Sequence, residues 1–132
     1  MNRMAAKARP PFWMHKITEN DGNLITVRVS GKLTQEDYDD LIPTWKRLLA
    51  KRGTMRMLFI MDDFHGWTPA AAWDDLRFGT EHASKVERVA MVGEKKWQEW
   101  LTKIGSIFVM RHQVKYFDTS ALAEAERWVR AG

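Results

Sequence analysis

The chain has 132 residues, of which 45% are hydrophobic and 29% are charged, a composition typical of one folded domain with a sizeable core. No apolar run approaches the roughly 20 residues of a membrane-spanning helix, and we expect no secretory signal because no apolar segment follows the basic N-terminus. The absence of cysteine excludes disulfides, thiolate zinc sites and cysteine nucleophiles, and is consistent with a cytoplasmic protein.

The net charge of +4 comes from the N-terminal end of the chain. Residues 1–16 contain four basic residues and no acidic one, so the remaining residues hold 17 basic and 17 acidic side chains. Nucleic-acid binding needs a basic face on the folded part of a protein, and we therefore expect no nucleic-acid partner. We expect residues 1–11 to form a flexible basic arm, or alternatively one that contacts phosphate or acidic lipid, and residues 12–132 to form a single domain.

Two strands joined by a tight turn are predicted next. In residues 13–19 and 24–30 the type of side chain changes from one position to the next, as in a strand with two different faces. The stretch Asn20-Asp21-Gly22-Asn23 between them is typical of a hairpin turn. We expect an antiparallel pair whose second strand ends at Gly31. One face of that strand would hold Leu24, Thr26 and Arg28, and the other would hold Ile25, Val27 and Val29.

A helix is predicted from Thr34 to the glycine at position 53. Thr34 can act as the N-cap residue, and Asp37 lies three residues further on, which is close to the capping-box pattern. Lys51 and Arg52 ahead of Gly53 are typical of a helix C-terminus. The apolar residues that recur at helical spacing are Tyr38, Leu41, Ile42, Trp45, Leu48 and Leu49.

Strands and helices then alternate along the chain. The apolar run at residues 56–61 predicts a strand buried on both faces, followed by a loop at residues 62–67. Thr68 before Pro69 predicts the start of a helix that runs to about His82. The remaining segments are a strand at 86–92, a helix at 94–104, a strand at 114–117 and a helix at 120–130. The order β-β-α-β-α-β-α-β-α predicts an α/β fold with a mostly parallel sheet and an antiparallel N-terminal edge strand.

Three stretches of the chain carry a resemblance to a known family. They are Asp62-Asp63-Phe64-His65-Gly66-Trp67-Thr68 followed by Ala72-Trp73-Asp74-Asp75; Val86-Glu87-Arg88-Val89-Ala90-Met91-Val92-Gly93 with Lys95, Lys96 and Trp97; and Tyr116-Phe117 ahead of Ala125 and Trp128. With these stretches the chain resembles the SpoIIAA-like family of small bacterial proteins, over about residues 13–129. The resemblance implies a STAS-type βα superhelix with most helices against one sheet face. It also implies apolar-ligand binding, similar to that of CRAL-TRIO domains, and membrane association as themes of function.

One departure from the wider STAS class concerns regulation. Anti-sigma antagonists of that class carry an Asp-Ser-Ser-Gly stretch at the start of the second helix, where a serine is phosphorylated. The comparable stretch here runs from Phe64 to Thr68 and has no serine. We expect the Thr68 hydroxyl to cap the helix instead, which argues against a phosphorylation switch but not against the fold.

Polar side chains follow the strands whose carboxyl ends meet at one edge of the sheet. Histidine, aspartate and lysine together are sufficient for acid–base chemistry, but there is no nucleophile elbow, phosphate loop or glycine fingerprint. The alternative is a solvated rim with capping roles, and we expect neither an enzyme nor a cofactor. The spacing of His15, His65, His82 and His112 also predicts no metal site. The polar residues at this edge are Lys32, Asp62, Asp63, His65, Lys95 and Lys96.

Aromatic residues around the second and third predicted helices suggest a ligand pocket. Pockets are mostly apolar with a few polar groups, so the hypothesis combines two sets of side chains. The apolar wall would consist of Phe64, Trp67, Trp73, Trp97 and Trp100, and the polar groups would be His65, Arg77 and Lys96. The alternative is that these aromatic residues are core, with Trp67 packed as a hydrophobic staple on the second helix.

An apolar segment follows the third predicted helix, where a polar connection is the usual case. Its apolar residues are Ile104, Ile107, Phe108, Val109 and Met110. Residues 95–115 contain five basic residues and one acidic residue, and basic residues around exposed apolar side chains favour membrane-surface binding. The segment is therefore expected to be a lid or membrane-facing patch, or alternatively part of the core.

The leading hypothesis is a non-enzymatic binding module for an apolar or amphipathic small molecule, with a cytoplasmic location and an expected contact at the inner membrane face. The alternative is a STAS-like protein-interaction or regulatory module that lacks the phosphorylatable serine. A homodimer is compatible with both hypotheses.

Overall fold

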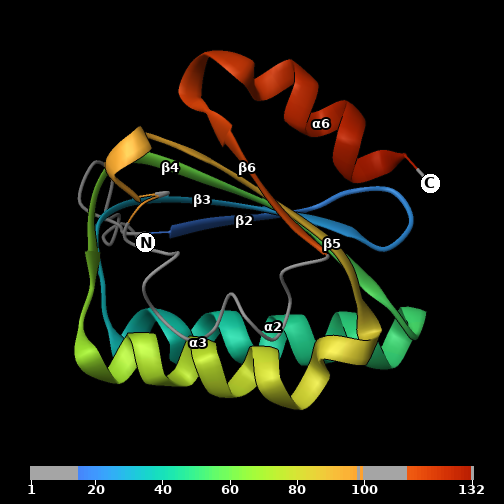
Figure 1. Ribbon diagram of the computed structural model, residues 1–132. Helices are drawn as coiled ribbons and strands as arrows, with labels where there is room; N and C mark the ends of the chain where they lie inside the picture. Colours follow the sequence, from blue (N-terminus) through green and yellow to red (C-terminus); the bar gives the residue numbers. More distant parts are fainter. Residues whose placement is uncertain (1–14, 98, 100–112, 132) are drawn as a thin grey trace, which may run out of the picture.

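A five-stranded sheet crosses the middle of the computed structural model, which describes residues 15–97, 99 and 113–131 (Figure 1). The strands lie side by side in chain order, and β2 is antiparallel to β3 whereas the later neighbours are parallel. The sheet consists of β2 (His15–Glu19), β3 (Leu24–Leu33), β4 (Met55–Trp67), β5 (Val86–Gly93) and β6 (Val114–Asp118). The predicted mostly parallel sheet with an antiparallel edge strand is thus confirmed.

The hairpin between β2 and β3 forms where its turn residues predicted it. Gly22 has a φ of 73°, in the left-handed region that favours glycine. The Asn20 amide donates to the carbonyl of Leu24 at 2.9 Å, and the Thr26 hydroxyl donates to the Asn20 side chain at 2.7 Å. The first two residues of the predicted first strand lie outside the described residues.

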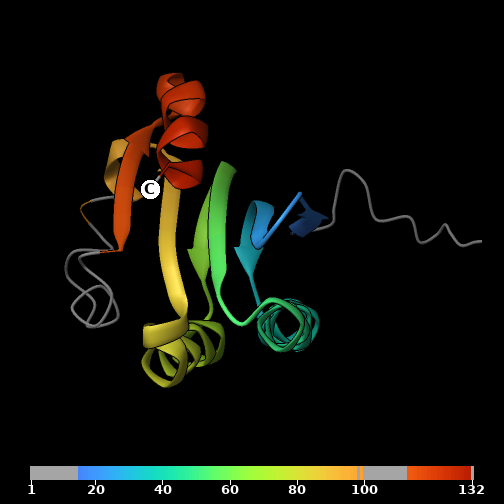
Figure 2. The ribbon, with the colours of Figure 1, turned by 90° about the vertical axis from the view of Figure 1, so that its right-hand side faces the viewer.

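The helices cover both faces of the sheet. Helices α2 (Gln35–Arg52) and α3 (Pro69–His82) lie side by side on one face, and α6 (Leu122–Arg130) lies on the other (Figures 1 and 2). Short 3₁₀ turns at Ala83–Lys85 and Thr119–Ala121 precede β5 and α6. Residues 95–97 and 99 are helical, and the rest of the helix predicted at 94–104 lies outside the described residues.

Helix α2 has the predicted signals at both ends. The Thr34 side chain accepts from the Asp37 amide at 3.4 Å, and the Asp37 carboxylate accepts from the Thr34 amide at 2.8 Å, which completes a capping box. At the other end, Gly53 adopts a φ of 85° and donates to the carbonyl of Leu49 at 2.7 Å. Both ends of the helix therefore satisfy backbone groups that the helix itself leaves unpaired.

Helix α3 starts as predicted, whereas α6 starts later than predicted. The Thr68 hydroxyl accepts from the Ala71 amide at 3.2 Å, ahead of Pro69 in the first turn. Before α6, the Asp118 carboxylate accepts from the amide and the hydroxyl of Ser120 at 3.0 and 2.7 Å. These bonds hold residues 119–121 in a 3₁₀ turn, so the helix begins at Leu122 and not at Ser120.

Two sequence predictions about the ends of β3 and β4 were wrong. Strand β3 does not end at Gly31 but continues to Leu33, and residues 62–67 are the last part of β4 and not a loop. Gly31 pairs with Phe64 across a register shift, with a φ of 60°, and Asp63 has a φ of 47°. The register of β3 and β4 shifts at residues with a left-handed backbone conformation, in a β-bulge. Residue types that are typical of turns, such as Asp63, therefore lie within the strand here.

The core has two parts, one on each face of the sheet. The larger contains Ile25, Val27 and Val29 of β3 together with the apolar sides of α2 and α3, which confirms that these three residues share one face of the strand. The smaller lies under α6 and includes Leu58 and Val129. On the α2–α3 side, the surfaces that point away from the sheet belong to two helices that lie side by side (Figures 1 and 2).

Candidate functional site

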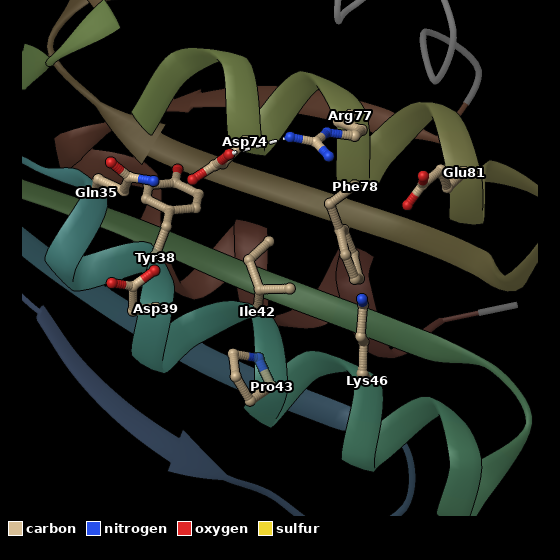
Figure 3. A pocket seen from close by; sticks show the side chains of 10 residues that line it. All are labelled: Gln35, Tyr38, Asp39, Ile42, Pro43, Lys46, Asp74, Arg77, Phe78 and Glu81. Carbon is tan, nitrogen blue, oxygen red and sulfur yellow. Dashed lines mark ion pairs between the residues drawn. The ribbon is translucent and has the colours of Figure 1, made fainter. Parts of the chain in front are cut away.

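A groove of about 320 Å³ lies between α2 and α3. Its apolar part is formed by Tyr38, Ile42 and Phe78, and in Figure 3 the side chains of Ile42 and Phe78 point into the space between the two helices. Charged groups of both signs surround this apolar part. The other residues that line the groove are Gln35, Asp39, Pro43, Lys46, Asp74, Arg77 and Glu81.

A chain of hydrogen bonds lies beside the groove and joins three elements. The Trp67 indole N–H at the end of β4 donates to the Tyr38 hydroxyl on α2 at 2.9 Å. The Tyr38 hydroxyl in turn donates to the Asp75 carboxylate on α3 at 3.1 Å. Because Tyr38 is 1% exposed, this chain fixes the position of a side chain that also lines the groove.

The surroundings of Asp75 change its proton affinity. Removal from solvent raises the pKa of this carboxyl group from 3.8 to about 6, although the hydrogen bond from Tyr38 opposes the shift. Burial and the nearby charge of Asp75 raise the pKa of Tyr38 well above its ordinary value. Tyr38 therefore stays protonated at neutral pH, whereas Asp75 changes its protonation state near pH 6.

Aromatic residues support the groove from below and from the side. Trp45 is 1% exposed, and its ring centroid lies 5.9 Å from that of Tyr38 and 5.0 Å from that of Phe78. His82 stacks on Phe78 with 4.4 Å between ring centroids, and its Nδ1 atom lies 3.0 Å from the Phe78 carbonyl. The apolar floor is thus held by packing on both sides, which favours a preformed site over one that must be assembled.

The aromatic residues predicted to line a pocket fall into two groups. Phe64, Trp67 and Trp97 pack edge to face, with centroid distances of 4.7, 5.0 and 6.0 Å. A Cβ atom at Gly66 would lie 3.2 Å from the Trp97 ring, so the backbone approaches this cluster closely. Trp73 does not join the cluster and is 60% exposed, and Trp100 lies outside the described residues. The hypothesis of a pocket at this cluster stays a prediction.

The predicted polar groups are spread over the strand ends and two helices. Arg77 lines the groove, with one guanidinium nitrogen 3.8 Å from an Asp74 oxygen (Figure 3). The Lys96 ammonium lies 5.5 Å from the centroid of the Trp97 ring and 3.9 Å from Glu94. The described contacts therefore do not place Arg77 and Lys96 at one common site.

The acidic residues at the end of β4 have local partners. Asp62 pairs with Arg28, and Asp63 lies 3.4 Å from the exposed His65. Lys32 and Lys95 lie at the surface near the same strand ends. Within the described ranges, no group of three histidine, aspartate or glutamate residues could hold a metal ion. Residues 104–110, the predicted lid or membrane patch, lie outside the described residues.

Sequence reasoning did not identify the groove, although a signal for it existed. Tyr38 and Ile42 are four residues apart in α2, and Asp74 and Phe78 are four residues apart in α3. Residues at this spacing share one helix face, so Tyr38 and Ile42 share a face of α2, and Asp74 and Phe78 share a face of α3. The pairing of these two faces depends on the tertiary packing, which the spacing alone does not reveal.

The parallel sheet with an antiparallel edge, covered by helices on both faces, defines an α/β domain of the STAS type. The chain matches the SpoIIAA-like family model over residues 24–130 and belongs to the SpoIIAA-like family. A solved structure of an uncharacterized protein from the DUF3478 family with a SpoIIAA-like fold, from Shewanella loihica PV-4, is similar to it, with a TM-score of 0.69 and 29% identity. The match covers 87% of this chain and 91% of that one. No curated protein matches the chain.

No helix in the described part of the chain is long and apolar enough to cross a membrane.

Proposed function

We propose that this protein is a non-enzymatic binding module that holds an amphipathic small molecule in the groove between α2 and α3. The observation that carries the proposal is the groove itself, whose volume of about 320 Å³ lies at the lower end of the range of small-molecule sites. Its apolar floor would take the hydrocarbon part of such a molecule, and its charged rim would take the polar part.

The form of the groove also supports binding without catalysis. Its carboxylates and cations lie at the rim, where Asp74 and Arg77 contact each other, and the floor consists of Tyr38, Ile42 and Phe78. The Tyr38 hydroxyl, which could otherwise act as an acid, is engaged by Trp67 and Asp75. These features favour holding a molecule over transforming it.

The test is the binding of the fluorescent amphipathic anion 8-anilinonaphthalene-1-sulfonate, together with mass spectrometry of small molecules that copurify with the protein. Ile42→Phe, which extends a larger side chain into the groove, should weaken probe binding at least tenfold while the free energy of unfolding stays within about 1 kcal/mol. Trp73→Ala is the matched control, because Trp73 is exposed on α3 and does not line the groove. A probe that is lost with Trp73→Ala and kept with Ile42→Phe would contradict the proposal.

A second candidate function is protein interaction, and Trp73 is the observation that favours it. Its side chain is 60% exposed, and it is the large hydrophobic residue that stands out as exposed within the described part of the chain. Tryptophan and arginine are enriched at the centres of protein interfaces, and Arg77 follows one turn later on the same helix.

Trp73→Ala should then reduce the recovery of a partner protein by affinity capture without changing probe binding in the groove. Flotation with vesicles that contain phosphatidylglycerol is the second arm, since a membrane surface is the other expected contact. Neutralisation of Lys95, Lys96 and Lys103 should reduce flotation if the membrane contact is electrostatic, and should leave protein capture unchanged.

A further inference from the structure

Asp75 lies at the acidic end of the hydrogen-bond chain beside the groove. The chain runs from the Trp67 indole N–H through the Tyr38 hydroxyl to the Asp75 carboxylate. Tyr38 lines the groove, so the carboxylate lies one hydrogen bond behind the wall of the proposed binding site. A change in the charge of Asp75 is therefore felt both by the position of Tyr38 and by the electrostatic potential in the groove.

We infer that Asp75 is a proton-controlled switch for the groove, which binds anionic amphipathic molecules more tightly when Asp75 takes up a proton from solvent. The inference rests on the proposed function, because it assumes that the groove is the binding site. In the ionised state, Asp75 accepts from Tyr38 and adds a negative charge behind the groove wall. In the protonated state that charge is gone, and Tyr38 loses an ionised acceptor, which is the stronger kind.

The described groups around Asp75 on α2 and α3 include several further carboxylates. From α2, it faces the Tyr38 hydroxyl, while Asp37 and Asp39 are further acidic groups on the same helix. On α3, the neighbouring Asp74 contacts Arg77. Among the described contacts, no ion pair joins Asp75 to a lysine, arginine or histidine.

The proton affinity of Asp75 supports the same inference. Its pKa is raised to about 6, mainly by removal from solvent, so the carboxyl group changes charge in mildly acidic solution. An anionic ligand that favours the protonated form would raise this pKa further, since linkage between two binding events is reciprocal.

His82 is the main competing explanation for any pH dependence in the groove. It stacks on Phe78, which lines the groove, and its ring can also carry a proton. Protonation of His82 would add a positive charge and would also favour an anionic ligand. The experiment must therefore separate the two residues.

The first measurement follows the indole N–H resonance of Trp67 by NMR from pH 4.5 to pH 8, assigned with Trp67→Phe. This readout needs no ligand, and so it tests the switch even if the proposed function fails. The resonance should titrate with a midpoint near the pKa of Asp75, about 6, and should become independent of pH in Asp75→Asn. A resonance that does not titrate, or one that titrates unchanged in Asp75→Asn, would overturn the inference.

The second measurement is the affinity for 8-anilinonaphthalene-1-sulfonate at pH 5 and pH 8, because its sulfonate stays ionised throughout. The wild type should bind about three- to tenfold more tightly at pH 5, since a coupling of one pKa unit corresponds to a tenfold change in affinity. Asp75→Asn should bind at both pH values as the wild type does at pH 5.

Two matched variants complete this measurement. Glu126→Gln removes an exposed carboxylate on α6, on the face of the sheet opposite the groove, and His82→Gln removes the competing histidine. Both should keep the dependence on pH. Loss of the pH dependence in His82→Gln, with its retention in Asp75→Asn, would assign the effect to His82 and overturn the inference.

Discussion

The two faces of the sheet are covered in different ways. On the α2–α3 face, large aromatic side chains fill the core, and Trp45, Tyr38 and Phe64 are all at most 2% exposed. On the α6 face, the buried cluster is smaller and mostly aliphatic, and one short helix of nine residues closes it. The buried cluster on the first face thus contains more side chains, and larger ones, than the cluster on the second.

Helix α6 is also held by hydrogen bonds to its C-terminal end. The Arg56 guanidinium on β4 donates to the carbonyl of Val129 at 2.9 Å and also to that of Ala131. Arg88, its neighbour on β5, donates to the carbonyl of Trp128 at 2.6 Å. Cations satisfy the unpaired carbonyls and the negative dipole at a helix C-terminus. Both faces are therefore packed, and on the α6 face charge-assisted hydrogen bonds to the backbone add to the packing.

The largest expected effect comes from the packed face. Trp45→Ala should lower the free energy of unfolding by about 3–5 kcal/mol, because it removes a large buried ring and leaves a cavity. Urea denaturation followed by circular dichroism measures this change. A loss below about 1.5 kcal/mol would show that the α2–α3 face collapses around the gap and is not packed as described.

Trp45→Phe is the matched control for that prediction. It keeps an aromatic ring between Tyr38 and Phe78, and it removes an indole N–H that has no hydrogen-bond partner among the described residues. Since an unsatisfied buried donor is itself unfavourable, the loss should be only about 1 kcal/mol.

The second prediction concerns the bonds that hold α6. Arg56→Met keeps the apolar stem of the side chain but frees two carbonyls and the Glu87 carboxylate, which Arg56 contacts at 2.7 Å. We expect a loss of about 2 kcal/mol. Hydrogen exchange should show reduced protection in α6 and little change in α2 and α3, because local opening needs less free energy than global unfolding.

Arg47→Met provides the comparison for an exposed ion pair. Arg47 contacts Glu19 at 2.8 Å, but both side chains are largely in solvent, and such pairs contribute about 0–0.5 kcal/mol. If Arg56→Met has an effect as small as that of Arg47→Met, or if its effect is spread over all helices, the bonds to the end of α6 do not hold the helix.

The two faces also differ in how well the sequence predicted them. Helical spacing and end signals predicted α2 and α3 almost to the residue, because Thr34, Gly53 and Thr68 act through local bonds. The contacts of Arg56 with the end of α6 join residues more than 70 positions apart. No local pattern reveals such a contact, and so the role of Arg56 was not predicted.

The candidate site shows the same limit. Arg77 was predicted as a site residue, whereas Tyr38 and Ile42 were identified only as apolar positions of a helix, and Asp75 only as part of a motif. These residues form a groove and a hydrogen-bond chain because α2, α3 and the end of β4 lie close together in the folded chain. The continuation of β4 to Trp67 was itself missed, because Asp63 and Gly66 have the residue types of a loop but lie in a bulged strand.

The third prediction uses the titration of Asp75. Its pKa is about 6 in the folded chain against an ordinary value of 3.8, so the folded state binds the proton more tightly than the unfolded state. The contribution of Asp75 to the free energy of unfolding should therefore fall as the pH rises from about 4 to about 6, and the loss should persist at higher pH.

Asp75→Asn should remove this loss. At pH 8 the variant should be about 1–2 kcal/mol more stable than the wild type, which allows for solvent screening of a carboxyl group that is only partly buried. At pH 3.5 the two proteins should be equally stable. The measurement is urea denaturation at both pH values, with Asp74→Asn as the control that should not reproduce the change. A wild type as stable as Asp75→Asn at pH 8 would contradict the raised pKa.

The smallest effect is expected at the start of α3, where one hydroxyl caps the helix. Thr68→Ala removes the acceptor of the Ala71 amide and should lower the free energy of unfolding by about 1 kcal/mol, whereas Thr68→Asp should be nearly neutral because aspartate also caps. Urea denaturation of the two variants at pH 7 measures the difference. If Thr68→Asp were as unstable as Thr68→Ala, the hydroxyl would serve something other than the cap, and the start of α3 would depend on packing as the rest of its face does.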